Sequence, residues 1–91
     1  MKYFAVLLPM KDADKSQKFR PQHLAFLENM RNSGQVAVNG KFADGSGGLV
    51  IYKAESFQDC EALVKTDPYV AEGAREYEIF EWEAVWADNV T

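Results

Sequence analysis

Two short segments of this chain, residues 3–7 and 49–52, are apolar without interruption. Successive side chains of a β-strand point to opposite faces of a sheet, so strands at these positions are apolar on both faces. The rest of the chain offers two helix-length segments, and these can cover only one face. The other face needs a cover that the domain does not supply. A second subunit is the simplest cover, so we expect a homodimer.

The order of the predicted elements indicates the fold. Strands and helices follow one another as strand, helix, strand, strand, helix, strand. This is the doubled βαβ order of ferredoxin-like domains, and right-handed crossovers fold it into a four-stranded antiparallel sheet with both helices on one face. We predict an α+β fold and a single domain over residues 1–91. The predicted ranges are 2–8, 21–33, 35–42, 49–53, 57–66 and about 76–86.

Prolines set two of these boundaries. Pro21 suits the first turn of a helix, where its missing N–H is not needed, so the polar stretch 9–20 before it is predicted to be a loop. Asp67 precedes Pro68, and a residue before proline avoids the helical conformation. The second helix is therefore predicted to end there.

The apolar pattern of the last strand changes phase between Ile79 and Phe80. Tyr77 and Ile79 share one face, whereas Phe80, Trp82 and Trp86 carry the apolar pattern after the change. A β-bulge produces such a change, and so does a strand that leaves one sheet to join another, such as a partner's. Both interpretations make Trp82 and Trp86 candidate interface residues.

Composition excludes several partners. The net charge is −4 with no basic, aromatic-interleaved patch, so we expect no nucleic-acid binding. No apolar run approaches the roughly 18 residues of a membrane span, and the short N-terminal apolar stretch has no cleavage site. We expect no membrane contact and a cytoplasmic location. The single cysteine, Cys60, allows no internal disulfide and is predicted to be a buried structural thiol.

Motif searches for cofactor and metal sites give nothing. The chain has no phosphate-binding glycine motif, no CxxC and no HExxH, so we predict no cofactor and no metal. The glycine-rich stretch 45–48 joins two predicted strands and is typical of a hairpin turn. Ser46 within it could still contact a ligand.

His23, the only histidine, is the main candidate for chemistry. The predicted fold makes the two helices antiparallel, so the start of the first, with His23, lies beside the end of the second, with Asp67. The helix dipole disfavours a protonated imidazole there, whereas the carboxylate favours it. These opposed effects suit an acid or base near neutral pH. Arg20 could bind a carboxylate or phenolate. The alternative is a structural His–Asp hydrogen bond that ties two helix ends together.

The chain carries four short motifs, which are Arg20-Pro21-x-His23-Leu24, Gly40, Ala43-Asp44-Gly45-Ser46-Gly47-Gly48 and Asp67-Pro68-Tyr69-Val70. In this order and spacing they resemble the YciI-like (YCII-related) family over nearly the whole chain. The resemblance implies a ferredoxin-like dimeric α+β barrel whose two sheets face each other, with a pocket His–Asp pair that maps onto His23 and Asp67. One departure is Lys41, where the family often has proline, and it bears on the shape and charge of the pocket rim.

The resemblance also implies a function. A related member is a lyase that dehydrochlorinates a hydroxyquinol, and the wider fold includes muconolactone isomerases and small monooxygenases. We therefore expect a cofactor-independent lyase or isomerase that acts on a small anionic, aromatic or lactone-like compound. His23 would shuttle the proton, and Asp67 would orient His23 and balance its charge. Arg20, Ser46 and Tyr69 would bind substrate.

Two other functions remain open at this point. The same pocket could belong to a non-catalytic binding or accessory domain, in which the His–Asp pair is structural. A monooxygenase that degrades heme or forms quinones is a third option, although one histidine is available and no sequence feature favours that chemistry.

Overall fold

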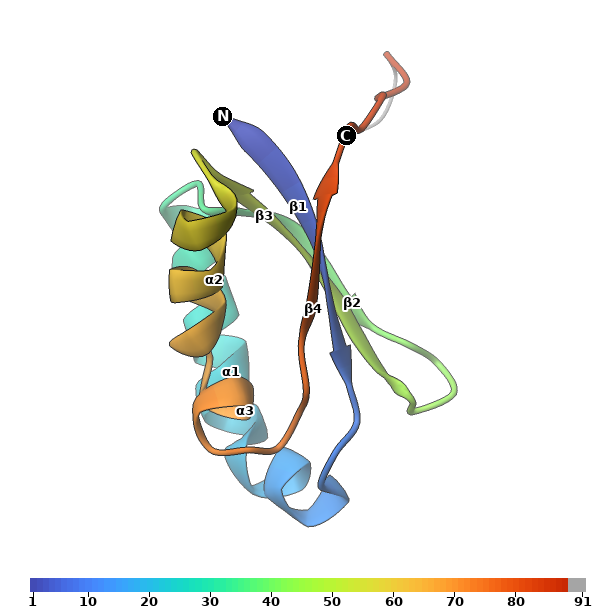
Figure 1. The fold of residues 1–91 in the computed structure, drawn as a ribbon. Coiled ribbons are helices and arrows are strands. Elements are labelled where there is room, and N and C mark those ends of the chain that lie inside the picture. Colours follow the sequence, from blue (N-terminus) through green and yellow to red (C-terminus); the bar gives the residue numbers. More distant parts are fainter. Residues whose placement is uncertain (89–91) are drawn as a thin grey trace.

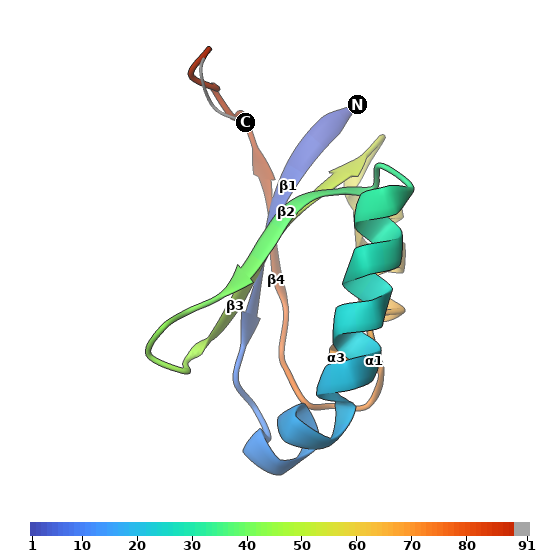
Figure 2. The same ribbon diagram turned by 180° about the vertical axis from the view of Figure 1, so that it is seen from behind.

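The structure, a computed structural model that describes residues 1–88, contains four strands and three helices in these residues. The strands form one antiparallel sheet in the order β2-β3-β1-β4, and the helices lie on one face of it (Figures 1 and 2). This confirms the predicted α+β, ferredoxin-like fold. The elements are β1 (Lys2–Pro9), α1 (Ala13–Asn32), β2 (Val36–Lys41), β3 (Gly47–Ala54), α2 (Phe57–Lys65), α3 (Pro68–Ala71) and β4 (Glu78–Trp82).

The start of α1 differs from the prediction. Residues 9–20 are predicted as a loop with the helix starting at Pro21, and this is wrong. The helix begins at Ala13, because the Asp12 carboxylate accepts a hydrogen bond from the Lys15 amide (3.0 Å) and caps the first turn. Pro21 lies inside α1, whose light-blue first turns run at an angle to the rest (Figures 1 and 2). Such a bend is expected at a proline, which removes one helical hydrogen bond.

The last strand is regular and shorter than predicted. The β1–β4 ladder has no register shift at Ile79, so the predicted bulge is absent from it, and β4 ends at Trp82. It ends there because Trp82 pairs with Tyr3, next to the first residue of β1. Ile79 packs against the helix-covered core, whereas Phe80, one residue on, points to the opposite face. The apolar pattern therefore changes phase because the apolar residues before Phe80 face the helix-covered core, whereas Phe80 and Trp82 face the other side of the sheet.

The core fills the space between the sheet and the helices. β1 and β3 contribute alternate residues to it, and α1 and α2 contribute the side chains that cover them. Among residues 1–88, no helix is both long and apolar enough to cross a bilayer. The buried core residues are Phe4, Val6, Leu8, Leu27, Val36, Val50, Tyr52, Ala54, Cys60 and Val64.

The opposite side of the sheet, which we call the open face, has no helix over it in the described residues (Figure 1). One apolar row crosses all four strands there, because Val38, Ile51, Ala5 and Phe80 are successive partners in the ladders. Val38 and Phe80, at the two edges, are each 52% exposed, and Trp82 is 43% exposed. The double-sided apolar character predicted for the central strands is confirmed.

The Cys60 thiol gives a test of the core. Its side chain is fully buried in α2, and burial raises the pKa of the thiol to about 11. The thiolate is the reactive form, so we expect negligible reaction with Ellman's reagent in native protein at pH 8. Protein unfolded in guanidinium chloride is the control and should react with one equivalent. Complete reaction of the native protein within minutes would contradict the placement of Cys60.

Candidate functional site

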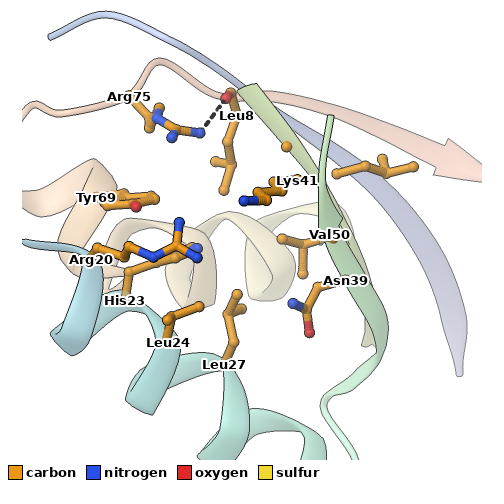
Figure 3. A pocket seen from close by; sticks show the side chains of 13 residues that line it. Leu8, Arg20, His23, Leu24, Leu27, Asn39, Lys41, Val50, Tyr69 and Arg75 are labelled. Carbon is orange, nitrogen blue, oxygen red and sulfur yellow. Dashed lines mark hydrogen bonds between the residues drawn. The ribbon is translucent and has the colours of Figure 1, made fainter. Parts of the chain in front are cut away.

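A cavity opens between α1, the ends of β2 and β3, and the segment around α3 (Figure 3). Its polar lining comes from parts of the chain that are far apart in sequence. α1 contributes Arg20 and His23, β2 contributes Lys41, and the segment around α3 contributes Tyr69 and Arg75. Leucine and valine side chains form much of the remaining wall (Figure 3).

His23 lies on the inner side of α1 and is 8% exposed. It precedes the buried Leu27 by one helical turn, so both side chains point toward the sheet. The predicted position in the first turn is wrong, because α1 starts at Ala13. The helix dipole acts mainly within the first and last turns, so the predicted dipole effect on His23 does not apply.

Asp67 is fully buried and joins α1 to α3. It is the N-cap of α3, where its Oδ1 accepts a hydrogen bond from the Tyr69 amide (2.9 Å). The same oxygen lies 2.8 Å from His23 Nδ1, which confirms the proximity expected from topology. Asp67 follows α2 as predicted, but it faces the start of the next helix. Within residues 1–88, its other oxygen, Oδ2, has no hydrogen-bond partner.

The contact with Asp67 assigns the two ring nitrogens of His23. An ionised carboxylate only accepts hydrogen bonds, so Nδ1 carries the hydrogen and donates it. In the neutral ring, Nε2 then holds a lone pair. Nε2 forms no hydrogen bond to any of residues 1–88, and His23 lines the cavity. Nε2 is therefore the atom able to accept a proton from a bound molecule.

Tyr69 supports the imidazole by stacking. Its ring lies 3.8 Å from the His23 ring, with 13° between the planes. The Arg75 guanidinium lies over the other side of the Tyr69 ring at 4.5 Å (Figure 3). Both faces of Tyr69 are thus occupied by the protein, so a ligand cannot stack on it. Tyr69 is predicted to bind substrate, and the structure leaves the edge of its ring and its hydroxyl for that contact.

Arg75 was not predicted, and it is held in place by neutral groups. Its Nε donates to Ser16 Oγ (3.0 Å) and its Nη1 to the Leu8 carbonyl (3.3 Å; dashed line in Figure 3). The one available signal is its position, since Lys65 and Arg75 are the basic residues in the otherwise acidic stretch 55–91. That signal does not show what Arg75 contacts, which depends on the fold.

Ser46 lies in the turn between β2 and β3 and does not line the cavity. Its amide donates to the Asp44 carboxylate (2.9 Å), and its carbonyl accepts from the Met10 amide. Hydrogen bonds from Ser46 lower the pKa of Asp44. The turn extends beyond the end of the sheet (Figure 1). The predicted site residues that the structure brings together are Arg20, His23, Asp67 and Tyr69.

A second, shallower hollow lies on the open face, behind the cavity. Asn39, Gly40, Lys41 and Leu49 border both. Residues 39–41 of β2 are therefore a wall shared by the two. Across residues 1–88, no group of three or more histidine, cysteine or acidic side chains is placed to hold a metal ion.

Comparison with known proteins identifies the family. The model of the YCII-related domain matches residues 1–83. The chain belongs to this family. The YCII-related chain is also 28% identical over 81 residues to YjpA, an uncharacterized protein of Bacillus subtilis (strain 168), with 89% of this chain and 95% of YjpA covered.

A solved structure shares the fold. It is the 5-chloro-2-hydroxyhydroquinone dehydrochlorinase TftG from Burkholderia phenoliruptrix AC1100, in complex with 2,5-dihydroxybenzoquinone. The TM-score is 0.75 at 20% sequence identity, and the match covers 89% of the YCII-related chain and 93% of TftG. Likeness at this level of identity shows a common fold.

Replacement of Asp67 by alanine tests its structural part. D67A removes the cap of α3 and leaves the His23 N–H without its buried acceptor, so we expect a loss of about 2–4 kcal/mol in the free energy of unfolding in urea. The matched control is D12A, which removes the exposed cap of α1 and should cost about 1 kcal/mol. An equal loss in both variants would contradict the buried role of Asp67.

Proposed function

We propose that this chain is a small-molecule enzyme of the lyase or isomerase type, which moves a proton with His23 and uses no cofactor. The observation that carries the proposal is the 2.8 Å contact between His23 Nδ1 and the buried Asp67 carboxylate at the wall of a cavity. This contact orients the ring and leaves Nε2 free to act as the base. Stacking on Tyr69 restrains the ring further.

The proposed reaction begins with proton abstraction. Nε2 takes a proton from a carbon of the substrate, and the C–H electron pair stays on the substrate as an enolate or phenolate. In an isomerase, the imidazolium returns the proton to another carbon. In a lyase, the electron pair instead expels a leaving group, and the proton later passes to solvent. Asp67 stabilises the imidazolium, and Arg20 binds the negative charge on oxygen.

The similarity to TftG supports the class of substrate. By its name, TftG acts on a chlorinated hydroxyhydroquinone, and its structure holds a dihydroxybenzoquinone. Both are small oxygenated rings that lose protons readily. We propose a small anionic compound, aromatic or lactone-like, for this chain. We leave Ser46 out of the binding set, because it does not line the cavity.

The second candidate is a non-catalytic domain that binds a metabolite in the same cavity. The observation that favours it is that Asp67 is fully buried and caps α3, which is a structural role. In that case the His23–Asp67 contact only ties α1 to α3. The two candidates differ in what loss of His23 does, namely a loss of turnover in the first and mainly a loss of stability in the second.

A set of phenols, hydroxyquinols and lactones, assayed for turnover, tests the catalytic proposal. For a compound that wild-type protein converts, H23A should lower kcat by about 10²–10⁴-fold, the usual contribution of a general base. The matched control is Q22A, an exposed neighbour on α1 outside the cavity, which should keep wild-type turnover.

Thermal unfolding with and without each compound completes the comparison. Turnover that survives H23A unchanged would refute the role of His23. If no compound is converted, but one of them raises the melting temperature, the binding domain is the correct function.

We also propose that a second copy of the chain covers the open face, which makes the protein a homodimer. The apolar row described above runs without interruption from edge to edge of the sheet. Tyr3, Trp82 and Trp86 extend it, with Trp86 packed edge-on against both other rings (5.8 and 6.2 Å between centroids). An exposed apolar patch of this kind is typical of an interface.

Light scattering on wild-type protein and F80D tests the dimer. Wild type should have twice the chain mass of 10.3 kDa at micromolar concentration. F80D places a charge within the apolar row, on the edge strand β4, and should shift the protein to monomer, because burial of one phenylalanine contributes about 1.5–3 kcal/mol. The control, F57D, changes an exposed phenylalanine on α2 and should remain dimeric. A monomeric wild-type protein would refute the proposal.

A further inference from the structure

Three positively charged side chains face the cavity. Arg20 comes from α1, Lys41 from the end of β2, and Arg75 from the segment after α3 (Figure 3). No aspartate or glutamate of the described chain is among the lining residues. This gathering of like charge stands out in a chain whose net charge is −4. Like charges in one cavity repel each other, and a bound anion relieves that repulsion.

These cations have no acidic partners within residues 1–88. The side chains of Arg20 and Lys41 form no hydrogen bond or ion pair there, and the Arg75 guanidinium donates only to a hydroxyl and a carbonyl. Elsewhere on the surface, Lys2 and Lys11 each pair with a glutamate. Lys15, Lys18, Lys53 and Lys65 are likewise without an acidic partner in the described residues, so lack of pairing alone does not distinguish the site. What distinguishes the cavity is that three unpaired cations line it together.

Asp67 contacts the cavity lining through His23, and its single charge offsets only part of the positive charge. It is fully buried behind His23 and engaged by the His23 ring and the Tyr69 amide. One carboxylate against three cations leaves two positive charges without compensation while the imidazole is neutral. A ligand with a single negative charge would leave one of them unmatched.

The β2–β3 pairing explains why Lys41 reaches the cavity. Asn39 pairs with Val50, whose side chain is buried under the helices, and Lys41 lies two residues further along the same strand face. The partner of Lys41 is Gly48, which has no side chain to fill the space. A Cβ at Gly48 would come within 3.0 Å of the Gly40 carbonyl oxygen, so a larger residue is disfavoured there.

We propose that Lys41 binds an anionic group of the ligand in this cavity, in addition to the arginines, and that the ligand is a small compound with two anionic groups. Two carboxylates, or a carboxylate and a phenolate or enolate, fit this charge. The proposal rests on the proposed function in placing the ligand in the cavity beside His23. It concerns binding alone, so it holds or fails whether or not the bound compound is converted.

Isothermal titration calorimetry with benzoate and with the three benzenedicarboxylates (ortho, meta and para) tests the proposal, since these probes differ in one carboxylate on the same ring. At least one dicarboxylate should bind wild-type protein about tenfold or more tightly than benzoate, because its second carboxylate gains a charge-assisted hydrogen bond from Lys41. K41M should remove this preference and leave the benzoate affinity within about threefold. K41R should keep the preference.

The matched control is K18M, which makes the same change at an exposed position of α1 outside the cavity. It should keep the wild-type preference for the dicarboxylate. The proposal is overturned if no dicarboxylate binds more tightly than benzoate, if none of the four probes binds at millimolar concentration, or if K41M and K18M have the same effect. These outcomes leave the turnover test of His23 untouched, so failure of the two proposals can be told apart.

Discussion

The burial of the Asp67 carboxylate is the constraint on which the site depends. A charge inside a protein costs several kcal/mol unless other groups compensate for it. The structure supplies a backbone amide at the start of α3 and the imidazole of His23, on an oxygen of the same carboxylate. These partners belong to two segments, and His23 and Asp67 lie 44 positions apart. Since the carboxylate needs both, the spacing between α1 and α3 and the orientation of the imidazole are set together.

The same carboxylate affects the surrounding core. Its Oδ2 is buried without a hydrogen-bond partner among the described residues. The negative charge of Asp67 also acts on the phenol of Tyr52 in β3. Burial raises the pKa of the Tyr52 phenol, and the charge of Asp67 raises it further. Tyr52 is therefore a neutral part of the core at physiological pH.

The sequence predicts the fold and the central pair better than it predicts the cavity. Periodicity gives the element order, and the order brings His23 to Asp67. Pro21 misleads, because a proline is also tolerated inside a bent helix, and the Asp12 cap decides where α1 begins. The position of Arg75 in the cavity has no local signal, since it depends on the path of the chain after α3. The family resemblance alone places Lys41 at the pocket rim, because its position depends on strand register.

The strand wall formed by residues 39–41 lies between the cavity and the hollow on the open face. A partner that packs on the open face therefore contacts one side of this strand wall, and a ligand in the cavity contacts the other side. Any coupling between the free energies of the two binding events is reciprocal. A ligand that tightens the association of two copies must itself bind more tightly to the associated form, by the same factor. A single edge strand would then transmit the state of the assembly to the site.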